Sequence, residues 1–269
     1  MPYRYAYLGV SALFVLAIVA FWPSYFSRLG ATSWPLHFHG MTATLWMLLL
    51  IAQGYVISSG RRALHRQLGR SVFALVPLFT AGGLIVVYTM NAADSPFADV
   101  QGPRLGFVDV VATGAFAGLC YAALANRRNV HLHGGYMLAT AILLIMPTVT
   151  RLHPFDYTAR LLPDATGFER FDLAFNVSAS FALAAVAVLY VCNRRHAAPF
   201  VAIAAISLLQ WAGYYLVQDL QMWSAVMDGM TAMPILLIGT IGFLIGAAAV
   251  SLGWRAGGAS WSYDPKAAW

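Results

Sequence analysis

The sequence predicts an all-helical (all-α), polytopic integral membrane protein that forms one bundle of eight transmembrane helices. Hydrophobic residues make up 60% of the 269 residues and charged residues only 10%, whereas about a quarter of the residues in soluble domains are charged. The hydrophobic residues fall into eight stretches, each close to the roughly 20 residues that cross a membrane as a helix. Basic residues gather between alternate stretches, as orientation signals do.

The spans form a single domain over residues 1–269. They are expected approximately over residues 6–25, 36–58, 71–91, 105–125, 134–152, 172–192, 199–217 and 231–253. The first span follows Arg4 and has no small-residue cleavage site, which predicts a signal anchor. The second lies between HFHG and the basic loop SGRRALHRQLGR. The third contains Pro77, and the fourth contains Asp109 and the small-residue pattern GAFAG, which favours close helix contact in lipid.

The second half of the chain continues the pattern. The fifth span lies between HLHG and RLHP and contains Pro147, and the long connection after it is expected to include a short interfacial helix. The sixth span ends at NRRHAAP. The seventh ends at aromatic residues such as Tyr214, which are expected in an interfacial belt. The eighth contains GFLIG, a second small-residue pattern.

The charges indicate how the bundle is oriented. If the spans alternate, one side receives Arg4, Arg61, Arg62, Arg66, Arg70, Arg127, Arg128, Arg194, Arg195 and Arg255, and the other receives most of the acidic residues. The positive-inside rule then places both termini in the cytoplasm of a bacterium, with the chain in the inner membrane. The basic excess is therefore an orientation signal, and no nucleic-acid partner is expected. The only lysine is Lys266 in the tail, which excludes a retinal-type Schiff base within the membrane.

Six histidines lie where spans two and five should meet water. The outer set is His37, His39 and His153, and the inner set is His65, His131 and His133. On a regular helix, residues i and i+2 point to opposite faces, so only one histidine of each H-x-H pair should face the bundle. Antiparallel packing of spans two and five would bring each set together.

The favoured interpretation is a cofactor-binding redox protein with two b-type haems. His39 and His153 would ligate the outer haem, and His65 and His133 the inner haem, because neutral imidazole suits iron. His37 and His131 are the alternative ligands. Electrons would pass between the membrane faces, or to a quinone or an oxidisable lipid.

Other interpretations stay open. Three histidines at one face could instead bind Zn, Cu or non-haem Fe in a lipid-modifying enzyme, with Asp109 orienting an outer histidine as a second-shell partner. HFHGMTATLWMLLLI and HLHGGYMLATAILLI could form an inverted repeat, as in transporters. The histidines could also be merely interfacial, in a non-catalytic subunit of a larger membrane complex.

The stretches LHFHGMTATLWMLLLIAQGYVISSGRRALHRQLGR and NVHLHGGYMLATAILLIMPTVTRL resemble a family of uncharacterised bacterial polytopic membrane proteins. The H-x-H-G and A-L-H-R-x-L-G signatures carry the resemblance, which covers about half of the chain. The family implies no activity. The layout of the histidines is also similar to that of membrane di-haem cytochrome b proteins, although those hold their ligands deeper in the bundle.

Overall fold

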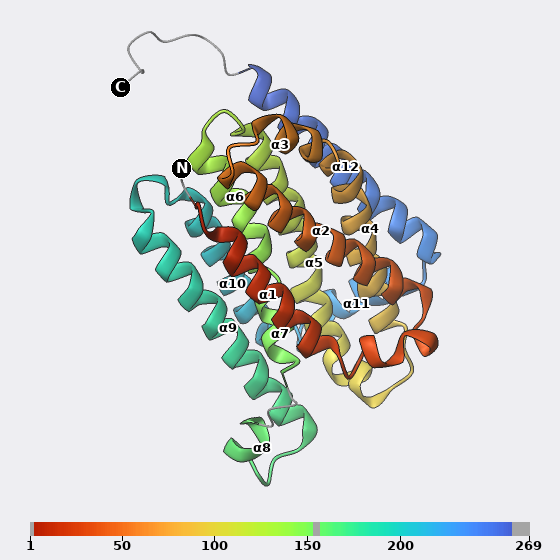
Figure 1. Cartoon of the computed structure of the whole chain (residues 1–269). Coiled ribbons are helices and arrows are strands. Elements are labelled where there is room, and N and C mark those ends of the chain that lie inside the picture. Colours follow the sequence, from red (N-terminus) through yellow and green to blue (C-terminus); the bar gives the residue numbers. More distant parts are fainter. Residues whose placement is uncertain (1–2, 153–156, 260–269) are drawn as a thin grey trace.

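The computed structural model of the protein describes residues 3–152 and 157–259. Every regular element in these ranges is helical. The elements are α1 (Ala6–Phe21), η1 (Phe26–Ala31), α2 (Trp34–Ser58), α3 (Arg62–Gly69), α4 (Val72–Asn91), α5 (Pro96–Ala125), α6 (Val130–Ile142), α7 (Ile145–Thr150), α8 (Tyr157–Leu161), α9 (Gly167–Cys192), η3 (Arg194–His196), α10 (Ala198–Leu216), α11 (Gln221–Thr231) and α12 (Ile235–Ala259). Figure 1 shows the long helices side by side, with the ends of the described chain, at the start of α1 and the end of α12, at one end of the bundle and α8 at the other.

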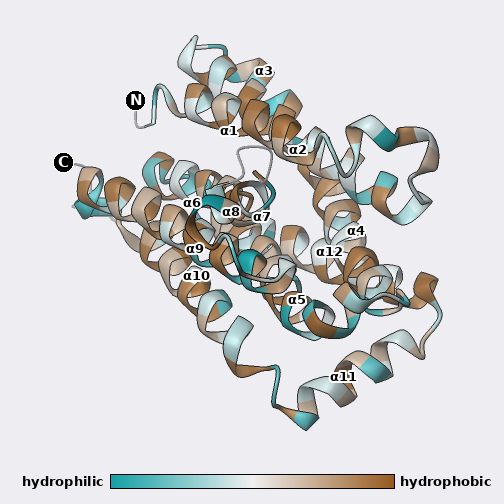
Figure 2. Ribbon diagram, turned by 90° about the horizontal axis from the view of Figure 1, so that it is seen from below, coloured by the Kyte–Doolittle hydropathy of each residue, from teal (hydrophilic) through white to brown (hydrophobic). Residues whose placement is uncertain are grey.

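Seven helical segments in the described part of the chain are long and apolar enough to cross a membrane, and they indicate a membrane protein. They correspond to the second through eighth predicted spans. The first predicted span forms a shorter helix, α1, of 16 residues. Figure 2 shows hydrophobic residues recurring along α9, α10 and α12, and Phe181, Leu209 and Leu244 are among the large apolar side chains exposed there. A hydrophobic exterior of this kind is suited to lipid.

Helix α4 lies at the centre of one half of the bundle and packs against α2, α5 and α12. Glycines allow the closest of these contacts. A Cβ atom added at Gly246 of α12 would lie 2.7 Å from the Cα of Pro77 in α4, so GFLIG forms the close approach that its pattern predicted. The GAFAG pattern does not form one, because the space around Gly114 and Gly118 is open for at least 4 Å.

Local signals fix where several helices begin and bend. Asn129 accepts hydrogen bonds from the backbone N–H groups of His131 and Leu132 and so caps α6. The fifth predicted span is broken between α6 and α7, four residues before Pro147. Proline lacks an N–H and its ring clashes with the carbonyl of residue i−4, which here is Leu143.

Three helices lie in connections rather than in spans. A short helix was expected after the fifth span and is found as α8, whereas α3 and α11 were not predicted. Helix α3 follows a turn at Gly60, whose φ of +75° is a conformation that glycine adopts readily. It brings the loop after α2 back over the end of the bundle that holds the termini (Figure 1).

Candidate functional site

Two histidines predicted to form the inner pair lie next to each other. His65 projects from α3 and His133 from the first turns of α6, and their ring centres are 6.4 Å apart with an interplanar angle of 84°. Imidazole–metal bonds of about 2 Å place two rings on opposite sides of one metal ion with their centres about 6.3 Å apart. The spacing of the two rings therefore matches that of a bis-histidine ligand pair.

His133 is held in a defined orientation. Its Nδ1–H donates a hydrogen bond to the carbonyl oxygen of Ala123, at 2.8 Å. The carbonyl can only accept, so this bond fixes the tautomer and leaves Nε2 with its lone pair. Metal-ligating histidines usually have such a backbone partner on the other ring nitrogen.

Both histidines line a large cavity of about 1070 Å³ at the end of the bundle that holds the termini. Its apolar wall comes from α1, α2, α4 and α6 and includes Val10, Leu49, Leu50, Ile57, Val72, Phe73, Met137 and Leu138. Trp46 also lines it, is fully buried and donates a hydrogen bond from its indole N–H to Thr140. The volume is slightly above the range of most small-molecule and cofactor sites, about 300 to 1,000 Å³.

Three polar atoms on this cavity wall are buried and have no hydrogen-bond partner among the described residues. They are the Tyr3 hydroxyl oxygen, Gln53 Oε1 and His65 Nδ1. Buried polar atoms are nearly always paired with protein or water, so each unpaired atom requires an explanation. A ligand in the cavity that supplies the missing hydrogen bonds or coordination provides one.

Burial also affects the chemistry of His65. It lowers the pKa of His65, and a smaller hydrogen-bond contribution from the Gln53 backbone opposes the shift. A lowered pKa keeps the imidazole neutral at physiological pH, and the neutral ring is the form that ligates a metal.

The other inner histidine does not join this pair. His131 lies on the opposite side of α6 and stacks on His196 of η3, with ring centres 4.1 Å apart and an angle of 10°. Within residues 3–152 and 157–259, no group of three His, Cys, Asp or Glu side chains could hold one metal ion. At this end the structure thus brings together two of the three histidines.

At the other end, His37 and His39 face different surroundings, because α2 is regular from Trp34. His37 Nε2–H donates to the carbonyl oxygen of Leu29, and its Nδ1 accepts from the Tyr25 hydroxyl. Both of its ring nitrogens are thus engaged. His39 points into the bundle beside Phe79, 5.4 Å between ring centres, and its Nδ1 has no partner among the described residues. His153, its predicted partner, lies outside the described residues.

Asp109 of α5 and His39 of α2 have one cation as a common neighbour. The Arg151 guanidinium, at the end of α7, interacts electrostatically with both Asp109 and His39, and it also lies over the ring of Phe21, 4.8 Å from its centre. Arg151 is exposed at the surface, so Asp109 lies beside an exposed cation that also acts on His39.

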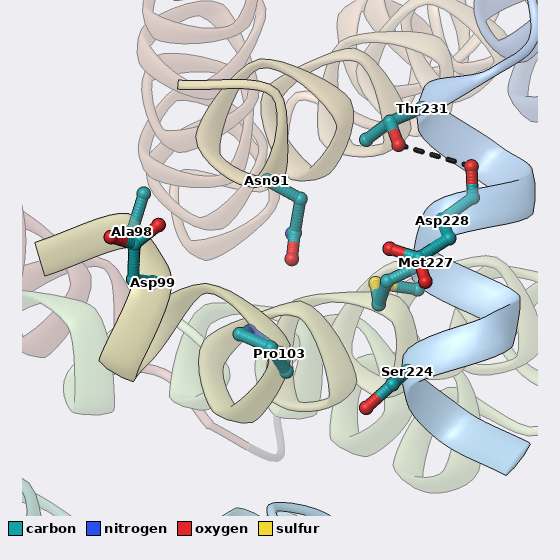
Figure 3. A pocket seen from close by; sticks show the side chains of 8 residues that line it. All are labelled: Asn91, Ala98, Asp99, Pro103, Ser224, Met227, Asp228 and Thr231. Atoms are coloured by element: carbon teal, nitrogen blue, oxygen red, sulfur yellow. Dashed lines mark hydrogen bonds between the residues drawn. The ribbon is translucent and has the colours of Figure 1, made fainter. Parts of the chain in front are cut away.

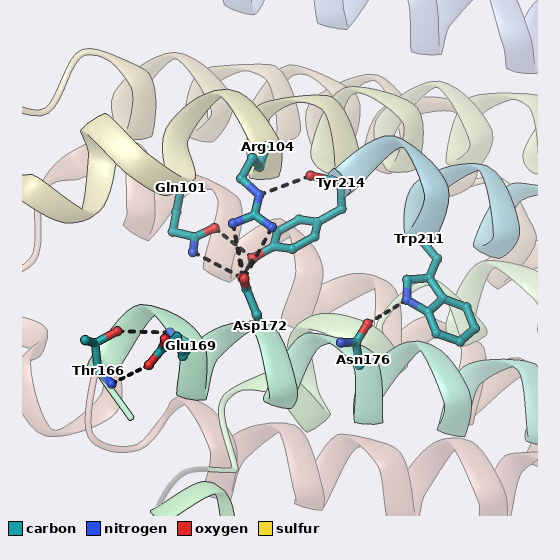
Figure 4. A network of polar contacts seen from close by, with 8 residues as sticks. All are labelled: Gln101, Arg104, Thr166, Glu169, Asp172, Asn176, Trp211 and Tyr214. Carbon is teal, nitrogen blue, oxygen red and sulfur yellow. Dashed lines mark hydrogen bonds and ion pairs between the residues drawn. The ribbon is translucent and has the colours of Figure 1, made fainter. Parts of the chain in front are cut away.

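A cluster of polar side chains lies between α5, α9 and α10, in the half of the bundle away from the large cavity (Figure 4). Arg104 forms an ion pair with Asp172 at 3.1 Å and donates from Nε to the backbone carbonyl oxygen of Tyr214. The Tyr214 hydroxyl donates to Asp172 and contacts Gln101. Tyr214 is fully buried, so its prediction as an interfacial belt residue is wrong. The charges and hydrogen-bonding groups of these side chains are paired with one another, which indicates a structural role.

A smaller pocket of about 140 Å³ lies between α5 and α11 (Figure 3). Asp99, Asp228, Asn91 and Met227 are among its lining residues, and Thr231 donates a hydrogen bond to the Asp228 carbonyl oxygen. It lies at the opposite end of the bundle from the large cavity and contains no predicted site residue.

Two arginines on the wall of the large cavity were not predicted to belong to a site. Arg66 and Arg70 line it, although their sequence pattern indicated only the orientation in the membrane. Their spacing of four residues beside His65 was the available signal, because residues i and i+4 share one face of a helix.

The chain matches no protein-family model, no curated protein and no solved structure. Its function is therefore argued from the geometry above.

Proposed function

We propose that the protein is a bacterial inner-membrane redox protein whose large cavity would bind a b-type haem, held by His65 and His133. The observation that carries the proposal is the spacing of the two rings, 6.4 Å between centres, on the wall of one cavity. When bound, haem takes up and releases one electron. A quinone or another lipid-like molecule would be the electron partner.

The residues around the cavity would each have a defined task. Ala123 orients His133 through its carbonyl oxygen, and burial keeps His65 neutral. The apolar wall excludes water and favours a porphyrin face, as hydrophobic shells around metal sites do. Ligation by His65 would use a ring whose Nδ1 otherwise has no partner among the described residues.

We further propose that α1 is an eighth crossing and that both termini lie in the cytoplasm. The support is that the two ends of the described chain lie against the start of α6 and the loop that precedes it. Tyr3 packs against Gly134, and Arg127 donates a hydrogen bond to the carbonyl of Trp254. An even number of crossings puts both termini on one side, and the arginine-rich loops of that side favour the cytoplasm.

The proposal is confined to the inner pair, since the partner predicted for His39 lies outside the described residues. The three-histidine metal site of a lipid-modifying enzyme is less well supported at the inner end. His131, which it requires, stacks on His196 instead of facing His65.

The test is a visible absorption spectrum of the purified full chain after loading with haem, before and after reduction with dithionite. We expect a Soret band that shifts and sharp α bands on reduction, both lost in His65→Gln and in His133→Gln. His131→Gln is the matched control, because it removes a histidine two residues away that faces elsewhere. A featureless spectrum, or bands that persist in both His65→Gln and His133→Gln, would overturn the proposal.

A further inference from the structure

The mouth of the large cavity has features of an anion-binding site. Arg66 and Arg70, one helical turn apart at the end of α3, line the cavity and are exposed at the surface. Arg62, one turn earlier on the same helix, is also exposed but does not line the cavity. The difference between these arginines is therefore their position relative to the cavity.

The two arginines are not engaged by other groups. Neither side chain forms an ion pair or a hydrogen bond with another described residue. The described lining of the cavity contains four arginines and two histidines but no carboxylate. Arg127, by contrast, has a structural partner, because it donates to the Trp254 carbonyl at 2.6 Å and stacks on that ring at 4.1 Å.

The cavity continues from this basic mouth into an apolar interior. Trp46 and Ile57 both line it from α2, and their separation of eleven residues corresponds to about 16 Å along a helix. The fully buried Trp46 is at the deep end. A ligand that fills this space must have an apolar body of that length and a polar group at one end.

We propose that Arg66 and Arg70 bind the carboxylate groups of an amphiphilic ligand whose apolar body extends toward Trp46. Arginine binds carboxylates through two parallel N–H···O bonds, which are roughly twice as strong as neutral hydrogen bonds. The propionates of haem would meet this requirement, and for that ligand the inference rests on the proposed function. A long-chain fatty acid carries the same carboxylate chemistry on an aliphatic body.

The experiment uses the full chain in detergent with ligands that differ only at the carboxylates. Protoporphyrin IX, which has no iron, is compared with its dimethyl ester, and cis-parinaric acid with its methyl ester. Binding is followed by quenching of tryptophan fluorescence, because Trp46 and Trp254 line the cavity. Since no iron is present, the result does not depend on ligation by His65 and His133.

We expect the free acid of at least one pair to bind about tenfold more tightly than its ester, which corresponds to roughly 1.4 kcal/mol. The double variant Arg66→Gln/Arg70→Gln should remove this preference. The double variant Arg61→Gln/Arg62→Gln, which removes two charges from the same segment outside the cavity, should retain it.

The outcomes separate this inference from the haem proposal. A carboxylate preference for cis-parinaric acid alone, in a protein that gives no haem spectrum, would support the anion site and overturn the haem proposal. Equal binding of acid and ester in both pairs would overturn the anion site. So would an equal loss of preference in the Arg61→Gln/Arg62→Gln control, because the effect would then come from general surface charge.

Discussion

The ion pair between Arg104 and Asp172 gives a quantitative test of how α5 packs against α9. Replacing Asp172 by Asn keeps the shape of the side chain and an oxygen that can accept from the Tyr214 hydroxyl. It removes the negative charge opposite Arg104, whose side chain is 7% exposed. The substitution thus isolates the cost of leaving one buried cation without its partner.

The size of the effect follows from the exposure of the two partners. Removing one partner of a fully buried pair costs about 3–5 kcal/mol. Asp172 is 33% exposed, so water can partly replace its charge. Arg104 also keeps its bond to the Tyr214 carbonyl and its position over the Tyr214 ring, at 3.9 Å. Because of these two remaining interactions, we expect a loss of about 2 kcal/mol, below the range for fully buried pairs.

The assay is thermal unfolding of the purified protein in one detergent. For a chain of this size, about 2 kcal/mol corresponds to a fall in Tm of roughly 4–8 °C. Arg104→Gln and the double variant Arg104→Gln/Asp172→Asn complete a thermodynamic cycle, and the double variant should lose less than the sum of the single variants by about 1–2 kcal/mol. Additive losses, or an unchanged Tm in Asp172→Asn, would refute the reasoning that this pair is buried and coupled.

Three further predictions concern packing and pH. Gly246→Ala should destabilise the protein by about 1–3 kcal/mol, because the added methyl group would lie 2.7 Å from the backbone of α4. The control Gly114→Ala, at a position with open surroundings, should leave Tm unchanged or raise it. Equal Tm values in both variants would contradict the close packing of α12 on α4. Trp46→Phe should cost about 1 kcal/mol through the lost bond to Thr140, measured as a lower Tm than that of the wild type, and no change would argue against that bond. Burial lowers the pKa of His65 in the folded state, so the unfolded chain binds more protons below about pH 6.5, and the stability should fall as the pH falls through that value. Tm measured between pH 8 and pH 5.5 should therefore drop less in His65→Gln than in the wild type. An identical drop in both proteins would exclude this linkage.

Helix positions were predictable because each span contains enough apolar residues to dominate its own stretch. The short connecting helices and the exact position of the breaks were less predictable. The break before Pro147 has a local cause that the sequence does show, because proline removes one backbone hydrogen bond, but Pro77 lies inside the continuous helix α4, so a proline alone does not decide where a span breaks. Helix α3 has only 8 residues and α11 only 11, and short helices of mixed polarity resemble loops in a sequence.

Contacts between helices were predicted less well than the helices themselves. GAFAG and GFLIG have the same small-residue spacing, yet only GFLIG lies against a neighbouring backbone. The spacing permits a close approach but does not supply the partner helix. Tyr214 occupies a sequence position typical of an interfacial belt, and it is buried because Asp172 and Arg104, distant in sequence, provide its polar partners.

The histidines of the candidate site could be predicted from the sequence, but the cavity could not. His65 and His133 flank antiparallel segments, so the sequence could place them at one end of the bundle. The cavity beside them could not be predicted, because it results from how side chains of α1, α2, α4, α6 and α12 fail to fill a shared space. The roles of Arg66 and Arg70 depend on that cavity and were hidden for the same reason.

The length of α1 makes the shape of the cavity sensitive to the thickness of the surrounding bilayer. Helix α1 has 16 residues, about 24 Å in length at 1.5 Å per residue, against a hydrocarbon core of about 30 Å. With α1 as the eighth crossing proposed above, a membrane next to it would thin locally, or the helix would stand closer to the membrane normal than its neighbours. Tyr7 and Val10 of α1 form one wall of the cavity, so longer lipid acyl chains should shift that wall, and ligand affinity should vary with acyl-chain length in reconstituted vesicles.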